Sequence, residues 1–316
     1  MHKTPDMYKK LLQAVKENIG RLIVGKEEAI ELLMVGLASH SHILIEDVPG
    51  IGKTSIISAL ARSFDMDFKR LQFTPDLMPS DISGFTMYNP KSQSFEFHPG
   101  AVQTNLLLAD EINRTSPKTQ SALLEVMSED QVTVDGVTYE LPKPFMVMAT
   151  QNPVEYMGTY PLPEAQLDRF MLRIRLGYPT LQEELNMLEV HNKAKSYKDL
   201  DAIATREDIL NLIEDAEEVM VAEQVKGYIT DLTRATRNNP KIKLGASPRA
   251  SIMLLRASKA LALLKGRDYV LIDDAQKLLI PLLGHRILLS QEAKLEGYSN
   301  DGVIAEILRS IKAPKQ

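Results

Sequence analysis

Residues 43–55 read Ile43-Leu44-Ile45-Glu46-Asp47-Val48-Pro49-Gly50-Ile51-Gly52-Lys53-Thr54-Ser55. The apolar residues at its start are typical of a strand, the middle is a turn rich in glycine and proline, and the residues after Lys53 predict a helix. Glycines allow successive backbone N–H groups to turn towards an anion, and the N-terminus of the following helix carries partial positive charge. The stretch therefore predicts a phosphate-binding loop.

Two side chains in this loop have the chemistry that a magnesium nucleotide requires. Lys53 can reach the outer phosphates of ATP or ADP, and the Thr54 hydroxyl can hold Mg²⁺. Asp47 stands where the complete G-x-x-x-x-G-K-[ST] pattern has glycine, so we expect substitution of Asp47 by glycine to leave ATP binding intact. The predicted nucleotide-binding residues of the loop are Val48, Pro49, Gly50, Ile51, Gly52, Lys53, Thr54 and Ser55.

Bulk composition restricts the class of protein. The chain has 316 residues, of which 44% are apolar and 25% are charged, as expected for a globular protein with a substantial core. A net charge of −5 does not favour nucleic acid or an anionic membrane as a partner. The absence of cysteine excludes disulfides, thiolate catalysis and cysteine-ligated metal sites. With a polar N-terminus and no apolar run near ~18 residues, we expect a cytoplasmic protein without a membrane span.

The order of elements predicts an α/β fold with a mainly parallel, five-stranded sheet over the first 179 residues. Residues 74–81 contain two prolines and are expected to be a loop. Two small hairpins are expected at 85–98 and 132–139, the second around an Asp135-Gly136 turn. After Pro179 only helical periodicity remains, so we predict a nucleotide-binding domain over 1–179 and an all-helical lid over 180–316.

Acidic and amide side chains follow two of the predicted strands. Nucleotide sites in parallel sheets lie beyond the carboxyl ends of strands, which is where Asp110, Glu111 and Asn152 occur. Asp110 would complete the Mg²⁺ shell opposite Thr54, and Glu111 would polarise an attacking water. Asn152 would position that water or contact the γ-phosphate. The alternative for the acidic pair, a helix cap or a solvated turn, is disfavoured by the phosphate loop upstream.

Two arginines are further candidates. Arg249 opens a long predicted helix, where a cation opposes the helix dipole, and an anion such as the γ-phosphate would relieve that conflict. Arg169 is either an ordinary surface residue or an arginine finger directed at the nucleotide of a neighbouring subunit. Spacing alone does not separate these alternatives, and Arg114 is a second candidate for the finger.

These motifs resemble those of the AAA+ ATPases and, among them, of the MoxR family. Residues 47–54 are similar to its Walker A loop, and residues 109–114 to its Walker B segment. Residues 72–81 and 163–170 are similar to signatures of that family. The resemblance implies that Asn152 is sensor 1, Arg169 the arginine finger, Arg249 sensor 2, and Val24 and Gly25 the segment that contacts adenine.

The resemblance also implies a homo-hexameric ring and chaperone-like work on client proteins, with von Willebrand factor A domain proteins as possible partners. The two hairpins match the inserts of that clade. Because the segment after the second strand has no aromatic–hydrophobic–glycine pore loop, remodelling or cofactor insertion is favoured over processive unfolding. Two alternatives are a nucleic-acid motor, disfavoured by near-neutral or acidic hairpin tips, and a nucleotide-gated scaffold, disfavoured by Glu111.

Overall fold

The central feature of the computed structural model is a five-stranded parallel sheet. The structure describes residues 4–48, 50–151, 158–192 and 197–314, so Pro49 and Asn152 lie outside the described residues. The spatial order of the strands is β2 (Phe68–Gln72), β5 (Leu106–Asp110), β8 (Met146–Gln151), β1 (His42–Glu46) and β9 (Phe170–Ile174). The predicted α/β class and the parallel sheet are confirmed.

Each face of the sheet has its own apolar core because successive strand residues point to opposite faces. Ile43 and Ile45 of β1 belong to one core, and Leu44 belongs to the other. Against the first face lie α1 (Pro5–Gly20), α2 (Glu27–Ala38) and α3 (Lys53–Ser63). The second face is covered by α5 (Pro117–Glu129), which begins at Ser116 with a proline at its first position. Burial on both faces explains why these strands are continuous apolar runs.

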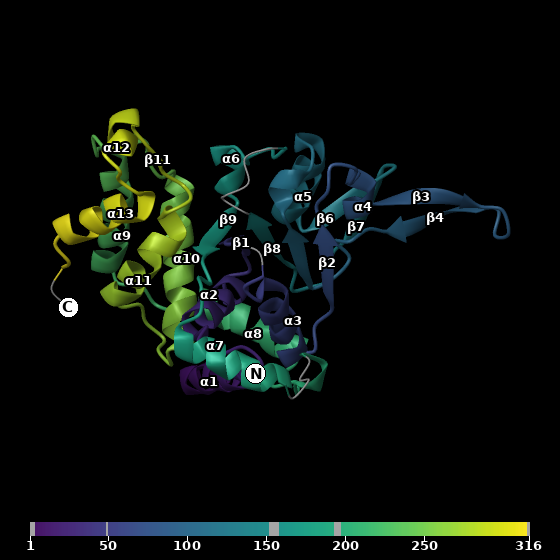
Figure 1. Ribbon diagram of the computed structural model, residues 1–316, viewed down its shortest axis with the longest axis horizontal. Coiled ribbons are helices and arrows are strands. Elements are labelled where there is room, and N and C mark those ends of the chain that lie inside the picture. The colour runs from purple at the N-terminus through teal and green to yellow at the C-terminus, as the bar shows by residue number, and fades with distance from the viewer. Residues whose placement is uncertain (1–3, 49, 152–157, 193–196, 315–316) are drawn as a thin grey trace.

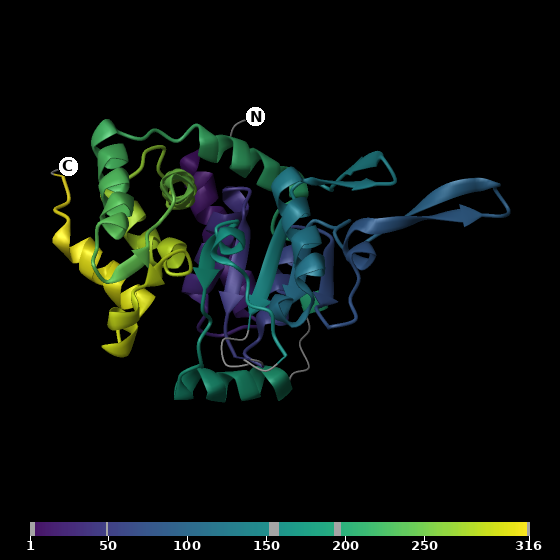
Figure 2. The same cartoon turned by 90° about the horizontal axis from the view of Figure 1, so that it is seen from above.

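Two hairpins extend from the flank of the sheet that carries β2 (Figures 1 and 2). They are β3 (Gly84–Asn89) with β4 (Ser94–Pro99), and β6 (Gln131–Val134) with β7 (Val137–Glu140). The expectation of a plain loop over 74–81 was wrong at its end, where α4 (Pro79–Ser83) begins. The Asp81 carboxylate accepts the Met78 N–H at 2.8 Å and so caps this helix, a local contact that outweighs the loop signal of the prolines.

The part after residue 179 is mainly helical. Residues 223–314 lie on the opposite flank, beside β9, whereas residues 181–192 and 206–217 lie near the N-terminal helices (Figure 1). The helices of the part after residue 179 are α7 (Leu181–Asn192), η2 (Tyr197–Asp199), α8 (Arg206–Glu217), α9 (Glu223–Arg237), α10 (Pro248–Leu264), α11 (Ile272–Leu283), α12 (Gln291–Leu295) and α13 (Asn300–Ser310). It also contains an antiparallel pair, β10 (Ile242–Leu244) and β11 (Leu288–Leu289). The expectation of helices alone was therefore wrong for these strands, which are too short to show a period of two.

The apolar core does not stop at the predicted boundary near Pro179. One continuous core contains residues of α1, α2 and the sheet together with residues of α8, α10 and α11. Tyr8 of α1 donates a hydrogen bond to Asp215 of α8, and Glu31 of α2 receives bonds from Lys265 and Lys277. The division into 1–179 and 180–316 stays a prediction, and the helical part packs as a continuation of the N-terminal helices. No helix among the described residues is long and apolar enough to cross a bilayer.

Candidate functional site

The predicted phosphate loop joins the end of β1 to the start of α3. Gly50 and Gly52 have φ of +86° and +88°, and Gly52 directly precedes the first residue of α3. This left-handed backbone is readily accessible to glycine and turns the chain sharply into the helix. Lys53 donates from Nζ to the backbone oxygen of Asp47 at 3.0 Å. The described residues therefore combine a strand end, two left-handed glycines and a helix N-terminus, the elements from which phosphate-binding loops are built.

The end of β8 connects this loop to the acidic pair. The Asp47 N–H donates to the Gln151 oxygen at 3.3 Å. One residue earlier, the Thr150 hydroxyl donates to Asp110 Oδ1 at 2.6 Å and accepts the N–H of Glu111 at 2.8 Å. The last two residues of β8 thus contact the phosphate loop on one side and Asp110 and Glu111 on the other, so the structure brings these predicted residues to one edge of the sheet.

Asp110 fits a magnesium site that is completed by a nucleotide. Its second oxygen, Oδ2, accepts a hydrogen bond from Arg70 Nη2 of β2 at 2.6 Å. Among the described residues no group of three or more His, Cys, Asp or Glu side chains could hold a metal alone. Mg²⁺ commonly binds through one or two protein oxygens together with phosphates and waters, and the Thr54 hydroxyl and the Asp110 carboxylate suit that role.

Glu111 has an unusual backbone and two side-chain partners. Its φ is +58°, in the left-handed region that residues other than glycine seldom adopt. Its Oε2 accepts from Gln72 Nε2 at 2.7 Å and from Arg114 Nη1 at 3.0 Å. Strained backbone is concentrated at functional sites, which supports a chemical role for this carboxylate. Arg114 lies in η1 (Ile112–Arg114) and contacts the acid of its own chain.

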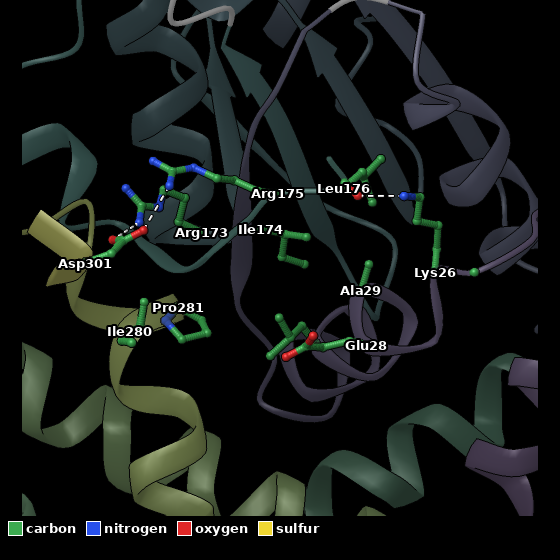
Figure 3. A pocket seen from close by; sticks show the side chains of 12 residues that line it. Lys26, Glu28, Ala29, Arg173, Ile174, Arg175, Leu176, Ile280, Pro281 and Asp301 are labelled. Atoms are coloured by element: carbon green, nitrogen blue, oxygen red, sulfur yellow. Dashed lines mark hydrogen bonds and ion pairs between the residues drawn. The ribbon is translucent and has the colours of Figure 1, made fainter. Parts of the chain in front are cut away.

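The segment predicted to contact adenine lines a cavity of about 260 Å³ between α2, β9 and α11 (Figure 3). Gly25 and Lys26 lie on one wall, and Arg173 of β9 and Arg175, one residue after its end, approach Asp301 on another. A side chain at Gly25 would collide with Glu183 of α7, so only glycine fits there without displacing that carboxylate. Val24 is half-buried beside it.

The two candidate arginines lie at the opposite end of the strands, where β1 and β9 begin. We call this amino-terminal end the arginine edge and the carboxyl-terminal end, with the phosphate loop, the catalytic edge. Arg169 directly precedes β9, whose first residue, Phe170, pairs with His42 at the start of β1, whereas the phosphate loop follows the end of β1. A five-residue strand spans about 13 Å, so Arg169 is separated from the phosphate loop of its own chain. Arg249 is the second residue of α10, and Ser247, which directly precedes this helix, donates to Asp168 at 3.1 Å. Both arginines are thus on the same edge.

An ion pair between Asp168 and the buried Arg286 links the lid to the start of β9. Arg286 donates from Nε to Asp168 Oδ1 at 2.9 Å, and its side chain is 1% exposed. It also donates to the backbone oxygens of Phe170 and Met171, which lie on the outer edge of the sheet. Burial lowers the pKa of Arg286 to about 10, although the Asp168 carboxylate favours its charged form. The lid thereby satisfies carbonyl groups of the edge strand β9.

Comparison with known proteins agrees with this arrangement. Residues 42–172 match the ATPase family associated with various cellular activities (AAA), and residues 234–307 match the AAA lid domain. A protein from Cytophaga hutchinsonii assigned as an ATPase, with a crystal structure at 2.00 Å, superposes with a TM-score of 0.91 at 42% identity over 98% of this chain and 97% of that one. The fold and the site define an AAA+ ATPase module with a helical lid.

Sequence relatives identify the family within the AAA+ ATPases to which the chain belongs. The chain is 41% identical to chaperone MoxR1 of Mycobacterium tuberculosis over 94% of its own length and 81% of that protein. It is 50% identical to the uncharacterized protein YeaC of Bacillus subtilis, covering 97% of this chain and 96% of that one. Identity to protein MoxR of Methylorubrum extorquens is 27%, over 87% of this chain and 86% of that one. The chain belongs to the MoxR family of AAA+ ATPases.

Three contacts were missed by the sequence interpretation. Arg70 and Gln72 of β2 each hold one of the two acids, and Thr150 orients both. The only signal for Thr150 is its position as the last residue of a predicted strand, 145–150, and nothing local indicates Arg70 or Gln72. The Asp47 carboxylate also has partners that its apparent status as a substitute for glycine did not suggest, since it accepts the N–H groups of Leu176 and Gly177.

Proposed function

We propose that this protein hydrolyses ATP with Mg²⁺ and uses the cycle, in a ring of identical subunits, to remodel or mature partner proteins. The observation that carries the proposal is the meeting of the phosphate loop and the acidic pair at the end of β8. A phosphate loop alone would support nucleotide binding, and an acidic pair alone would support a turn. Together they supply the parts of a phosphoryl-transfer site.

The chemistry assigned to each residue follows from its position. The loop N–H groups, the start of α3 and Lys53 bind the phosphates, with Val48, Gly50, Ile51, Gly52 and Ser55 as the surrounding loop residues and Pro49 retained from the sequence. Thr54 and Asp110 would hold Mg²⁺, which neutralises phosphate charge when it is bound. The Glu111 carboxylate first breaks its hydrogen bonds to Gln72 and Arg114, and it then accepts a proton from the attacking water. Asn152 remains the proposed water-positioning residue.

A ring is proposed because the two halves of the site lie at opposite edges of one chain. Arg169 and Arg249 are on the edge away from the phosphate loop, so each is assigned to the nucleotide of the neighbouring subunit. An arginine that stabilises the γ-phosphate from a neighbour makes hydrolysis depend on assembly. Arg114 contacts Glu111 of its own chain and is therefore the weaker candidate for a finger.

Partner proteins are favoured over nucleic acid as the object of this work. The net charge is −5, and the two hairpin tips at residues 89–94 and 135–136 carry no cluster of basic residues. Electrostatic attraction to a phosphate backbone, the main source of nucleic-acid affinity, is absent from these features. The relative named as a chaperone supports a protein client, and a von Willebrand factor A domain protein and a cytoplasmic location stay part of the proposal.

Substitution of Glu111 by glutamine tests hydrolysis. The amide cannot accept the proton of water, so we expect turnover to fall at least about 100-fold while ATP binding is retained. Phosphate release and binding of a fluorescent ATP analogue measure the two properties. The control is Glu292→Gln at an exposed position of α12, where turnover should be unchanged. Hydrolysis at the native rate in the Glu111 variant would refute the assignment of the base.

Mixing variants tests the ring. Arg169→Ala subunits keep their own phosphate loop, and Lys53→Ala subunits keep their arginine. Each variant alone should be inactive, whereas a mixture forms interfaces that combine an intact loop with an intact arginine. We expect the mixture to recover part of the phosphate-release rate, and mixing two loop variants serves as the control. No recovery in a mixture that is shown to co-assemble would contradict trans action by Arg169.

A further inference from the structure

The backbone N–H and C=O groups of two residues, Leu176 and Gly177, where the chain leaves the sheet, are held between an anion and a cation. The Asp47 carboxylate accepts the N–H groups of Leu176 and Gly177, the second at 2.9 Å. The Lys26 ammonium donates to the backbone oxygens of the same two residues, at 2.7 and 3.2 Å. Figure 3 shows Lys26 directed at the backbone oxygen of Leu176. We call residues 176–177 with Asp47 and Lys26 the hinge clamp.

Both charged members of the hinge clamp belong to segments assigned to the nucleotide. Asp47 begins the phosphate loop, and its backbone oxygen accepts a hydrogen bond from Lys53. Lys26 directly follows Gly25 of the predicted adenine segment. A phosphate is a competing acceptor for the Lys53 ammonium, so phosphate binding changes a contact made to Asp47 itself.

The hinge, residues 176–177, determines where α7 begins. Only three residues separate Gly177 from the first residue of α7, and Gly177 has φ of +65°. Glu183 of α7 returns to lie against Gly25, beside Lys26. The contacts therefore run from the phosphate loop to the hinge, from the hinge to α7, and from α7 back to the adenine segment.

We propose that Asp47 and Lys26 are positioning residues that couple nucleotide binding to the hinge and to α7. This inference rests on the proposed function. It explains why aspartate occupies the first Walker A position, since glycine has no carboxylate to accept the N–H groups of Leu176 and Gly177. Through Asp47, phosphate binding alters the hydrogen bonds of residues 176–177. Through Lys26, binding of the base alters the hydrogen bonds of the same residues. Neither side chain is assigned to the chemical step.

Amide hydrogen exchange measures this coupling directly. A bond to a charged acceptor contributes enough that its loss should speed exchange of the Leu176 and Gly177 amides by about tenfold or more in Asp47→Ala without nucleotide. Asp47→Asn keeps an acceptor oxygen and should give an intermediate rate. Asp231→Ala, at an exposed position of α9, is the matched control and should leave both amides unchanged. Native exchange rates in Asp47→Ala would overturn the clamp.

Addition of Mg²⁺ and ADP separates coupling from a purely structural role. In the native protein ADP should slow exchange in the phosphate loop, at the hinge and in α7. In Asp47→Ala it should still slow exchange at residues 50–54 but lose its effect on the hinge and α7. Lys26→Met should also weaken the effect on α7, whereas Lys118→Met, at an exposed site, should not. Full protection of α7 in Asp47→Ala would refute the coupling.

The same measurement distinguishes the failure of this inference from failure of the proposed function. If ADP does not slow exchange at residues 50–54 of the native protein, nucleotide binding is refuted. The clamp itself would then still be tested by the exchange rates without nucleotide. If ADP protects the loop in both proteins and α7 equally in both, the proposed function stands and the coupling fails.

Discussion

The two edges of the central sheet differ in charge and in how their side chains are supported. At the edge where β1, β5 and β8 end, the acids are partly accessible: the side chains of Asp110 and Glu111 are 13% and 20% exposed. At the opposite edge, Asp168 precedes Arg169, accepts a hydrogen bond from Ser247 and pairs with Arg286, which is 1% exposed. One edge, the catalytic edge, carries the groups proposed to bind phosphate and metal, and the other, the arginine edge, carries the arginines that would complete the site of a neighbour.

This difference separates residues that act on a ligand from residues that also hold the fold. The catalytic edge is built from a loop and strand ends, whose side chains can be altered without opening a core. The arginine edge lies in the contact between the edge strand β9 and the lid, where Arg286 and His285 bond to backbone oxygens of β9. Changes at the two edges should therefore differ in their effect on stability.

The largest expected effect on stability comes from Arg286→Met. The change removes the partner of Asp168 and leaves the Met171 and Leu282 oxygens without the donor they have here. Breaking a buried ion pair costs about 3–5 kcal/mol. We expect a clearly lower melting temperature in thermal unfolding, whereas Lys53→Ala, on the phosphate loop, should change stability by less than about 1 kcal/mol. Equal melting temperatures for the two variants would contradict the distinction between the edges.

The arginine edge should also make stability depend on pH. His42 is buried, its Nδ1 accepts the Val147 N–H at 3.0 Å, and its Nε2 donates to the Met127 oxygen at 2.8 Å. Burial lowers the pKa of His42 to about 4, from an ordinary value of 6.5. Between those values the unfolded chain binds a proton that the folded chain does not, so stability should fall as the pH decreases from 6.5 towards 4. Burial lowers the pKa of His285 in the same direction.

Melting temperatures measured from pH 8 to pH 4 test this prediction. His42→Gln should show a weaker fall below pH 6.5, and Gln291→Ala, at an exposed position of α12, should keep the native slope. Glu31 adds a separate, more acidic range. Burial disfavours its charged form, but hydrogen bonds from Lys16, Lys265 and Lys277 lower its pKa to about 2, so its contribution is present above 4.5 and is lost towards pH 2. A flat profile between pH 6.5 and 4 would refute the histidine prediction.

What could be predicted from the sequence depends on how local the signal is. The phosphate loop, the acidic pair and the hairpin at Asp135-Gly136 combine turn residues with adjacent apolar runs, so their positions were found from a few neighbouring residues. The five-stranded sheet followed from repetition of that pattern. The strands β10 and β11, by contrast, are three and two residues long and pair across more than 40 residues, so no periodicity reveals them.

Side-chain partners across strands were not predictable for a different reason. Gln72 reaches Glu111 because β2 and β5 pair with Gln72 opposite Asp110, and a shift of one residue would point Gln72 to the other face. The Asp47 carboxylate meets N–H groups that are 129 and 130 residues away in the sequence. Such contacts depend on register and on the packing of distant segments. Asp47, which in the sequence is only a departure from the G-x-x-x-x-G-K-[ST] pattern, therefore has a defined structural role as an acceptor for Leu176 and Gly177.

The smallest expected effect concerns Gln72 and sharpens the comparison between the edges. The Gln72 amide bonds Glu111 at 2.7 Å, so Gln72→Ala should leave the carboxylate held by Arg114 alone and raise basal ATP turnover by roughly two- to tenfold, as loss of one hydrogen bond to a charged group allows. Nucleotide affinity should be unchanged, and Gln291→Ala, exposed at the start of α12, is the control. Phosphate release measures the rate.

The double variant with Arg169→Ala shows whether the edges act independently. If Gln72 only restrains the base, the gain in turnover still needs the arginine from the neighbour, and Gln72→Ala with Arg169→Ala should be as inactive as Arg169→Ala alone. A gain that survives loss of Arg169 would mean that the catalytic edge completes hydrolysis within one chain. Decreased turnover in Gln72→Ala would instead mean that Gln72 orients Glu111 for the reaction. Each result assigns the control of hydrolysis to one edge or to both.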